Sequence, residues 1–312
     1  MRFLLVLIAG QLWLTRAANL VLSNDDGWAE LNIRTFFNTL TASGHKVILS
    51  APADNMSRTG SKKKVPEILK KPCHYNSCAT GSPATGFNST NRRLNYVNSY
   101  PATAMEFGLQ KLAPKLFKKG RGTDLAITGM NVGVNTACSI FGSGTVGAAC
   151  EAVSQGVPAI AFNAKGSKRL PYTTTPVPLF ASVAADLAVK VTEMVLAGGK
   201  PYLPSNTFLN VNIGPVSPTK CSKASEFKFV LSRIHPVSRK AFLEDDKNPD
   251  DGMPPDVSTC GSLRLPSELS VIMAKGCWVS ISAGHSKTKK DYHEAQAPVL
   301  ARLRKFLTCL PK

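Results

Sequence analysis

The sequence has 312 residues, of which 43% are apolar, and it contains 23 Gly and 21 Pro. This much apolar sequence is enough to bury a full hydrophobic core, and it excludes a disordered or fibrous chain. The formal net charge of +18 favours anionic partners such as phosphate esters, nucleic acid, polyphosphate or an acidic cell wall, and it says nothing about the fold.

Residues 1–18 are typical of a secretory signal peptide. Arg2 is followed by an apolar run from Phe3 to Leu14, and Ala17 and Ala18 provide a cleavage site of small residues. A membrane-spanning helix needs about 20 apolar residues, so this run is too short to be an anchor. We therefore expect a secreted, extracellular protein without membrane insertion, whose mature chain begins at Ala18 or Asn19.

The cysteine content agrees with an oxidising compartment. The chain has 8 Cys, an even number, without a Cys-x-x-Cys motif and without a His pair at the spacing of metal ligands. We therefore expect disulfides rather than a metal cluster. Eight cysteines allow on the order of a hundred pairings, and the sequence singles out only the short loop between Cys73 and Cys78.

After the signal peptide, the chain alternates between short apolar runs and amphipathic segments. The apolar runs predict strands and the amphipathic segments predict helices, while 51–100 is polar and predicts a long loop or hairpin excursion. This order predicts an α/β fold with a Rossmann-like, doubly wound, mostly parallel sheet. The predicted strands are 19–23, 46–50, 124–128 and 158–162, and the predicted helices are 31–43, 101–117 and 145–155.

Beyond a predicted helix at 179–196 the sequence becomes less regular, although it has strand-like segments at 208–213, 227–231 and 278–281. We interpret 19–200 as the α/β core and 201–312 as a smaller, irregular C-terminal subdomain. We expect that subdomain to close the functional site or to make a dimer contact.

Two adjacent carboxylates, Asp25 and Asp26, follow the first predicted strand. A turn alone can explain Asp-Asp-Gly, but two neighbouring carboxylates in a crevice repel each other unless a cation is bound. Ser57 and Asn131 come after the second and third strands, and parallel strands place such positions at one edge of the sheet. An all-oxygen set of Asp25, Asp26, Ser57 and Asn131 suits Mg²⁺ or Mn²⁺ rather than Zn²⁺.

A glycine turn, Phe141-Gly-Ser-Gly-Thr-Val-Gly-Ala-Ala149, leads into the helix predicted at 145–155. The free N–H groups and the positive dipole end of a helix start make an anion site, so this turn predicts phosphate binding. Residues 142–147 also satisfy G-x-G-x-x-G. The motif is not in the first strand-to-helix turn and no acidic residue follows about 20 residues later, so redox chemistry with NAD(P) is a disfavoured alternative.

Five sequence blocks together resemble the SurE family of phosphatases and nucleotidases. The blocks occur in the family's order and spacing over about 19–162. They are Leu22-Ser-Asn-Asp-Asp-Gly27, Ala51-Pro52 with Ser57-Arg-Thr-Gly60, Thr128-Gly-Met-Asn-Val-Gly-Val-Asn135, Ser143-Gly-Thr-Val-Gly-Ala-Ala149 and Gly156-Val-Pro-Ala-Ile-Ala161.

The resemblance implies a Rossmann-like core that hydrolyses phosphomonoesters, often nucleoside monophosphates, and a dimer built through the C-terminal region. It places a divalent ion on Asp25, Asp26, Ser57 and Asn131, and the substrate phosphate near Asn131, Ser143, Gly144 and Thr145. This chain departs from the family's Gly-Thr-Pro-Ala segment, since it has Ser99-Tyr-Pro-Ala102, which leaves the pocket wall and the substrate choice open. After Pro201, only the segments 209–212 and 276–280 match the family's sequence pattern.

Several other polar features have simpler explanations. His235 and His285 are candidate general acids, but a single loop histidine is more often structural. The acidic segment 244–252 lacks the closing Glu of a calcium loop and contains Pro249, so we expect a solvated turn. Of the two glycosylation sequons, we expect Asn88 to be modified and Asn55 to stay free, because a glycan on Asn55 would crowd Ser57.

The sequence thus predicts a secreted, metal-dependent phosphatase with Asp25 and Asp26 as its catalytic residues, acting on a small phosphorylated substrate as a homodimer. Asp25 either attacks phosphorus directly or positions a water molecule, and nearby lysines such as those at 62–64 attract the substrate. The alternative is a catalytically weak secreted protein that binds RNA, polyphosphate or acidic cell wall through its basic surface.

Overall fold

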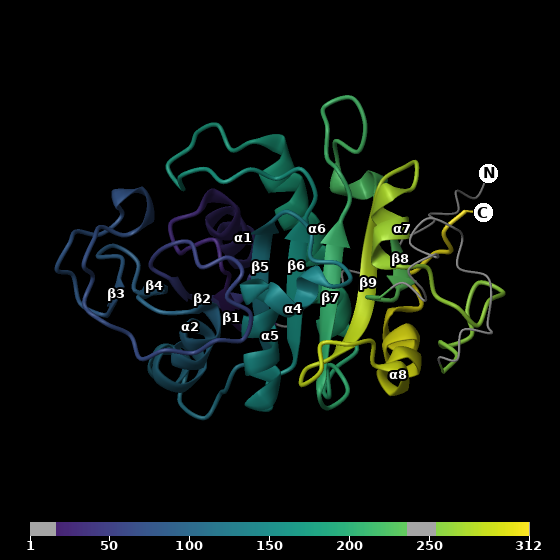
Figure 1. Cartoon of the computed structure of the whole chain (residues 1–312), viewed down its shortest axis with the longest axis horizontal. Coiled ribbons are helices and arrows are strands. Elements are labelled where there is room, and N and C mark those ends of the chain that lie inside the picture. Colours follow the sequence, from purple (N-terminus) through teal and green to yellow (C-terminus); the bar gives the residue numbers. More distant parts are fainter. Residues whose placement is uncertain (1–16, 236–253, 312) are drawn as a thin grey trace, which may run out of the picture.

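A computed structural model describes residues 17–235 and 254–311. The strands of this part of the chain form one nine-stranded sheet in the order β3-β4-β2-β1-β5-β6-β7-β9-β8 (Figure 1). The central strands are buried on both faces, as their continuous apolar sequences require. The strands are β1 (Asn19–Ser23), β2 (Lys46–Pro52), β3 (Thr85–Phe87), β4 (Leu94–Val97), β5 (Leu125–Val132), β6 (Ala159–Ala164), β7 (Thr207–Ile213), β8 (Lys228–Ser232) and β9 (Trp278–His285).

The sheet is mostly parallel, which confirms the predicted fold class. Strands β4, β2, β1, β5, β6 and β7 run in the same direction, while β3 pairs antiparallel with β4 and β9 pairs antiparallel with β7. The order reverses direction at β1, whose two neighbours are β2 and β5. Such a reversal leaves a crevice outside the carboxyl ends of the strands.

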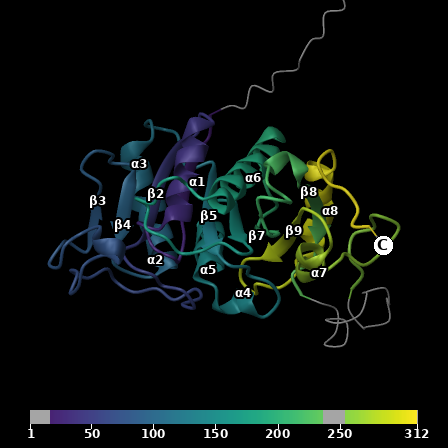
Figure 2. The same cartoon turned by 90° about the horizontal axis from the view of Figure 1, so that it is seen from above.

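Helices cover both faces of the sheet. In Figure 2, α1 (Leu31–Ala42) and α6 (Leu179–Ala197) lie on one side, while α2 (Pro101–Phe107) and α5 (Gly144–Ser154) lie on the other. Along β1 the side chains alternate, so that Leu20 and Leu22 join the core under α1, whereas Val21 joins the core under α5. Each face therefore buries its own hydrophobic layer, as expected for a doubly wound sheet.

The predicted helix at 101–117 is divided into three pieces. Helix α2 ends at Phe107, the turn η2 (Gly108–Leu112) is wider than an α-helix, and α3 (Ala113–Leu116) follows. Pro114 has no N–H to donate to the preceding turn, which explains why regular α-helical hydrogen bonding does not continue through this segment.

The polar excursion at 51–100 contains more regular structure than the sequence suggests. It includes the short helix η1 (His74–Asn76), and its β4 adds to the sheet beside β2. The predicted disulfide between Cys73 and Cys78 is present in this segment. Composition alone describes this region as a loop because its strands are only three and four residues long.

The C-terminal region extends the core sheet instead of forming a sheet of its own. β7 pairs with β6 in register from Ala159 beside Phe208 to Ala164 beside Ile213, so the sheet is continuous across the expected boundary at residue 200. The helices in the described part of this region are η3 (Ala224–Glu226), α7 (Glu268–Met273) and α8 (His293–Leu303). Site closure and dimer formation by this region stay predictions.

Two further disulfides lie in the C-terminal region. Cys221 pairs with Cys277, and Cys260 pairs with Cys309 near the end of the chain. Within the described ranges, no helix has both the length and the apolar character that a membrane span requires.

Candidate metal and phosphate site

The predicted site residues meet at the carboxyl ends of adjacent parallel strands. Asp25 and Asp26 follow β1, Ser57 lies in the loop after β2, and Asn131 is near the end of β5. These three strands are neighbours in the middle of the sheet (Figure 1). β5 extends beyond the predicted strand 124–128, because it continues through Asn131 after an irregularity in its pairing with β6.

Asp25 is bound to the start of α5. The residue is 2% exposed, and its Oδ2 accepts hydrogen bonds from the backbone N–H groups of Gly144 at 3.0 Å and Thr145 at 3.1 Å. Its Oδ1 accepts a third bond from the Thr145 hydroxyl at 2.9 Å. The two helix N–H groups that we predicted for substrate phosphate therefore hold a carboxylate of the chain itself in this structure.

The amide oxygen of Asn131 lies near the Thr145 hydroxyl that also contacts Asp25. Its Nδ2 donates to the backbone carbonyl of Gly133 at 3.0 Å, which turns Oδ1 toward the Thr145 hydroxyl, 3.3 Å away. Thr145 thus lies between the oxygens of Asp25 and Asn131. This contact brings together one predicted ligand from β1 and one from β5.

Asp26 is joined to Ser57 by an arginine. Asp26 Oδ2 accepts a hydrogen bond from the backbone N–H of Val132 at 2.9 Å, and its Oδ1 accepts one from Arg169 Nε at 2.7 Å. Arg169 Nη2 donates to Ser57 Oγ at 2.9 Å. Ser57 in turn donates to Asn55 Oδ1 at 2.8 Å, so a glycan on Asn55 would disturb this side of the site.

Burial controls the protonation of the two aspartates. Desolvation, helped by the charge of Asp26, raises the pKa of Asp25 to about 6, although the hydrogen bonds from Thr145 and Gly144 oppose this shift. Desolvation also raises the pKa of Asp26, against the N–H of Val132 and the guanidinium of Arg169. The predicted need for a cation beside the two carboxylates is thus met in part by Arg169.

The residues present fit a hard divalent cation. Two carboxylates, an amide oxygen and a hydroxyl are ligands that Mg²⁺ and Mn²⁺ prefer, and Asp25, Asp26, Asn131 and Ser57 supply them. In residues 17–235 and 254–311, no group of three or more His, Cys, Asp and Glu lies close enough to hold a metal ion. The oxygen donors of the four predicted ligands favour a hard ion over a zinc or thiolate centre.

Glycines at the start of α5 allow close packing around Asp25. A Cβ on Gly144 would lie 2.8 Å from Asp25 Cβ and 2.9 Å from Pro101 Cγ. A Cβ on Gly147 would overlap the backbone carbonyl of Gly60, in the loop that carries Ser57. Gly144 and Gly147 of the G-x-G-x-x-G pattern thus allow this close packing, and Ser143 caps the helix by accepting from Val146 N–H at 3.1 Å.

The segment that departs from the family pattern forms part of the site wall. Pro101 packs against Gly144, and Ser99 Oγ donates to the carbonyl of Lys64 at 2.5 Å. The N–H of Lys64 donates to Thr103 Oγ1 at 3.1 Å. Residues 99–103 therefore fix the position of the lysine loop beside the start of α5.

Two of the three lysines at 62–64 are less available than predicted. Lys63 forms ion pairs with Glu106 at 2.8 Å and Glu151 at 3.2 Å, and Lys64 forms one with Glu67 at 3.0 Å. These pairs neutralise part of the positive charge that we expected to attract substrate. Arg169 is instead the cation that contacts the predicted ligands.

Sequence reasoning did not assign a role to Arg169. A signal was present, because Arg169 belongs to a basic cluster after the fourth predicted strand, at the same edge of the sheet as the other site residues. The cluster as a whole resembles an ordinary solvated loop. Only the contacts of the guanidinium distinguish Arg169 from the lysines beside it.

The two candidate histidines lie apart from the predicted ligands. His235 Nδ1 is 3.3 Å from Asp291 Oδ2, and its ring lies 5.6 Å from that of Phe141. His285 packs edge-on against Tyr292, with ring centroids 4.8 Å apart. Neither forms a hydrogen bond with Asp25, Asp26, Ser57 or Asn131, and the acidic segment 244–252 lies outside the described residues.

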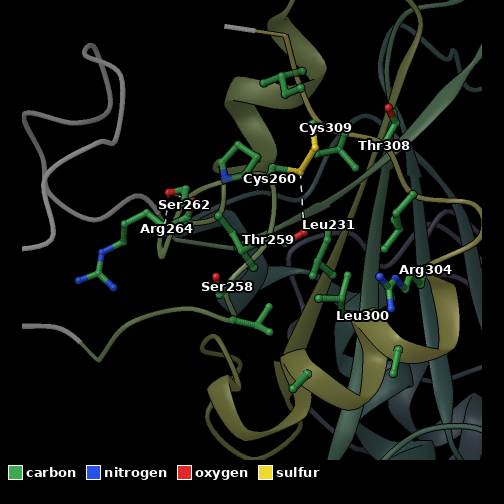
Figure 3. A pocket seen from close by; sticks show the side chains of 18 of the residues that line it. Leu231, Ser258, Thr259, Cys260, Ser262, Arg264, Leu300, Arg304, Thr308 and Cys309 are labelled. Carbon is green, nitrogen blue, oxygen red and sulfur yellow. Dashed lines mark hydrogen bonds between the residues drawn. A yellow bond between two sulfur atoms is a disulfide. The ribbon is translucent and has the colours of Figure 1, made fainter.

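A cavity of about 860 Å³ lies elsewhere, between β8, α8 and the C-terminal tail (Figure 3). The disulfide between Cys260 and Cys309 forms part of its wall, together with Leu231, Leu300 and Arg304. None of the predicted site residues lines it.

The model of the family described as "Survival protein SurE" matches residues 20–234. The chain belongs to the SurE family. This match spans the strands that carry Asp25, Asp26, Ser57 and Asn131, and it confirms the family predicted from the five sequence blocks.

Two kinds of curated relative are similar to this SurE family member. An acid phosphatase of Yarrowia lipolytica is 31% identical over 289 residues, which cover 84% of this chain and 78% of that protein. A 5'-nucleotidase SurE of Microcystis aeruginosa is 30% identical over 202 residues, which cover 65% of this chain and 64% of that protein. The match to the first of these extends beyond the family model.

The fold is also that of a solved family member. The crystal structure of the SurE protein from Aquifex aeolicus superposes with a TM-score of 0.59 at 21% sequence identity, covering 91% of this chain and 98% of that one. At this identity the likeness supports the fold alone.

Proposed function

We propose that this SurE family member is a secreted, metal-dependent phosphatase that hydrolyses phosphomonoesters, with nucleoside monophosphates as its substrate class. The proposal is carried by two sets of contacts: Asp25 and Asn131 meet at Thr145 at the start of α5, and Asp26 and Ser57 are linked through Arg169. The acid phosphatase and nucleotidase names of its relatives support the enzyme class, a phosphoric monoester hydrolase. Three disulfides support passage through an oxidising compartment.

The roles of the residues follow from their positions. Asp25, Asp26, Ser57 and Asn131 would hold the divalent ion, which when bound neutralises charge on the phosphoryl oxygens. We assign to Asp25 the role of the catalytic carboxylate, because it lies at the positive end of α5, near the position proposed for the substrate phosphate. Asn131, Ser143, Gly144 and Thr145 line the position proposed for that phosphate.

The function is tested on the mature chain with an aryl phosphate and with nucleoside monophosphates. We expect EDTA to abolish phosphate release and Mg²⁺ or Mn²⁺ to restore it. Asp26→Asn should lower kcat/KM by about 100-fold or more, because a buried ligand charge is lost. Asp186→Asn is the matched control, since Asp186 is an exposed residue of α6 and should keep full activity. A folded Asp26→Asn variant with unchanged activity would refute the metal assignment.

The alternative function, binding of an anionic polymer, rests on a separate basic segment. Five exposed cations follow one another along η2, α3 and the next loop, and no acidic residue lies between Glu106 and Asp124. If the same assay shows no turnover while polyphosphate or RNA binds with an affinity that falls steeply with salt, this alternative is supported. The five cations are Lys111, Lys115, Lys118, Lys119 and Arg121.

A further inference from the structure

Arg169 occupies two of the oxygens that the proposed metal ion needs. Its Nε donates to Asp26 Oδ1 at 2.7 Å, and its Nη2 donates to Ser57 Oγ at 2.9 Å. Asp25 and Asn131 have other partners, since Gly144 and Thr145 supply the donors around them. The guanidinium thus contacts two of the four proposed ligands, whereas the other two contact the start of α5.

A guanidinium and a divalent ion would compete for these oxygens, because both are cations that need the same acceptors at close range. Asp26 is 0% exposed, so its carboxylate requires a partner of opposite charge in either state. Arg169 meets this requirement without a metal, because its planar fork reaches Asp26 and Ser57 with different nitrogens. A divalent ion on the same oxygens would be repelled by the guanidinium at this distance.

Arg169 is placed so that it can withdraw from the site. Its side chain is 41% exposed, in contrast to the fully buried Asp26. The backbone on either side is held by other contacts, because Asn32 Nδ2 donates to the carbonyl of Lys168 at 3.1 Å and Leu170 N–H donates to Glu30 Oε1 at 3.4 Å. The side chain can therefore change position while the loop stays anchored.

We propose that Arg169 competes with the divalent ion for Asp26 and Ser57, and that metal binding releases its guanidinium to pair with the phosphate of the substrate. The proposal rests on the proposed function, because it assumes that the site binds a metal ion and a phosphomonoester. Once released, the guanidinium would lie at the rim of the site, where the doubly charged phosphate binds. The planar guanidinium can donate two parallel hydrogen bonds to such a phosphate. Arg169 then couples loading of the metal to binding of the anion.

The test is calorimetric titration of Mn²⁺ into the mature protein, followed by titration of inorganic phosphate into the Mn²⁺-loaded protein. Arg169→Gln should bind Mn²⁺ about tenfold more tightly than the parent chain, since a charge-assisted competitor is gone. The same variant should bind phosphate about tenfold more weakly. Lys168→Gln removes the neighbouring exposed charge and should change neither affinity by more than about twofold.

The possible outcomes separate this inference from the proposed function. Unchanged or weaker Mn²⁺ binding by Arg169→Gln would overturn the competition, even if the parent chain is an active, metal-dependent phosphatase. Tighter Mn²⁺ binding with unchanged phosphate binding would overturn the role toward the substrate. A parent chain that neither binds Mn²⁺ nor releases phosphate would refute the proposed function and the inference with it.

Discussion

At the scale of single residues, a glycine of α5 determines how closely the loop that carries Ser57 can approach the helix. Gly147 lies against the backbone of Gly60, and Gly60 N–H donates to the carbonyl of Gly142 at 2.9 Å. Glycine is unfavourable inside a helix by about 1 kcal/mol relative to alanine. The contact with the loop explains why it is present, since a side chain at this position would separate the two elements.

We predict that Gly147→Ala destabilises the protein by about 1–3 kcal/mol, because the clash with a backbone carbonyl outweighs the gain in helix propensity. Urea unfolding measures the loss. Gly142→Ala is the control, since its Cβ would meet nothing within 4 Å, and it should change stability by no more than about 0.5 kcal/mol. A Gly147→Ala variant as stable as the parent would show that the loop can move aside.

At the scale of elements, α7 begins with a buried carboxyl group. Glu268 is 0% exposed, and its Oε1 accepts a hydrogen bond from Asn210 Nδ2 at 2.8 Å. Asn210 and the neighbouring Asn212 also donate to the carbonyl of Asn135. A polar strip beneath α7 thus joins β7 to the loop after β5. Burial raises the pKa of Glu268 well above its usual value.

This shift predicts a pH dependence of stability. The folded state keeps the proton of Glu268 at pH values where the unfolded chain has lost it, so stability falls as pH rises above the usual Glu pKa of 4.5. Glu268→Gln keeps an acceptor for Asn210 and cannot ionise. We expect the Tm of this variant, relative to the parent, to increase between about pH 5 and about pH 8. An equal difference in Tm at both pH values would contradict the prediction.

At the scale of the whole molecule, disulfides hold the periphery of a continuous sheet. Cys260–Cys309 connects the loop before α7 to the C-terminal tail across 49 residues, whereas Cys73–Cys78 closes a loop of only 5. Cross-links that close longer loops remove more entropy from the unfolded chain. Cys138 and Cys150 are unpaired, so the even number of cysteines did not mean that all of them are bridged.

We predict that the paired replacement Cys260→Ser with Cys309→Ser lowers the free energy of unfolding by about 4 kcal/mol, whereas Cys73→Ser with Cys78→Ser lowers it by about 2 kcal/mol. Paired replacement avoids leaving a single free thiol at either site. Urea unfolding without reductant compares the two. A larger loss from the short loop would mean that local packing, rather than loop length, determines the contribution of these disulfides.

The sequence by itself was enough to predict the elements of the core and to place the candidate oxygen ligands at one edge of the sheet. The strands at 19–23, 46–50 and 158–162 are apolar runs ended by turn residues, and these signals are local. Parallel strands place their carboxyl ends together, so Asp25, Ser57 and Asn131 were expected to converge from their positions in the chain alone. The local signals were weaker in the excursion at 51–100, where the strands are too short to show a period.

Only the tertiary structure decided which groups satisfy the two carboxylates. Asp25 takes the first N–H groups of α5 and Asp26 takes the guanidinium of Arg169, partners that lie more than a hundred residues away in the chain. The pairing of Cys221 with Cys277 and the continuity of the sheet through β7 are decided in the same way. These contacts depend on how elements pack, and a periodic or compositional pattern carries no information about such distant pairs.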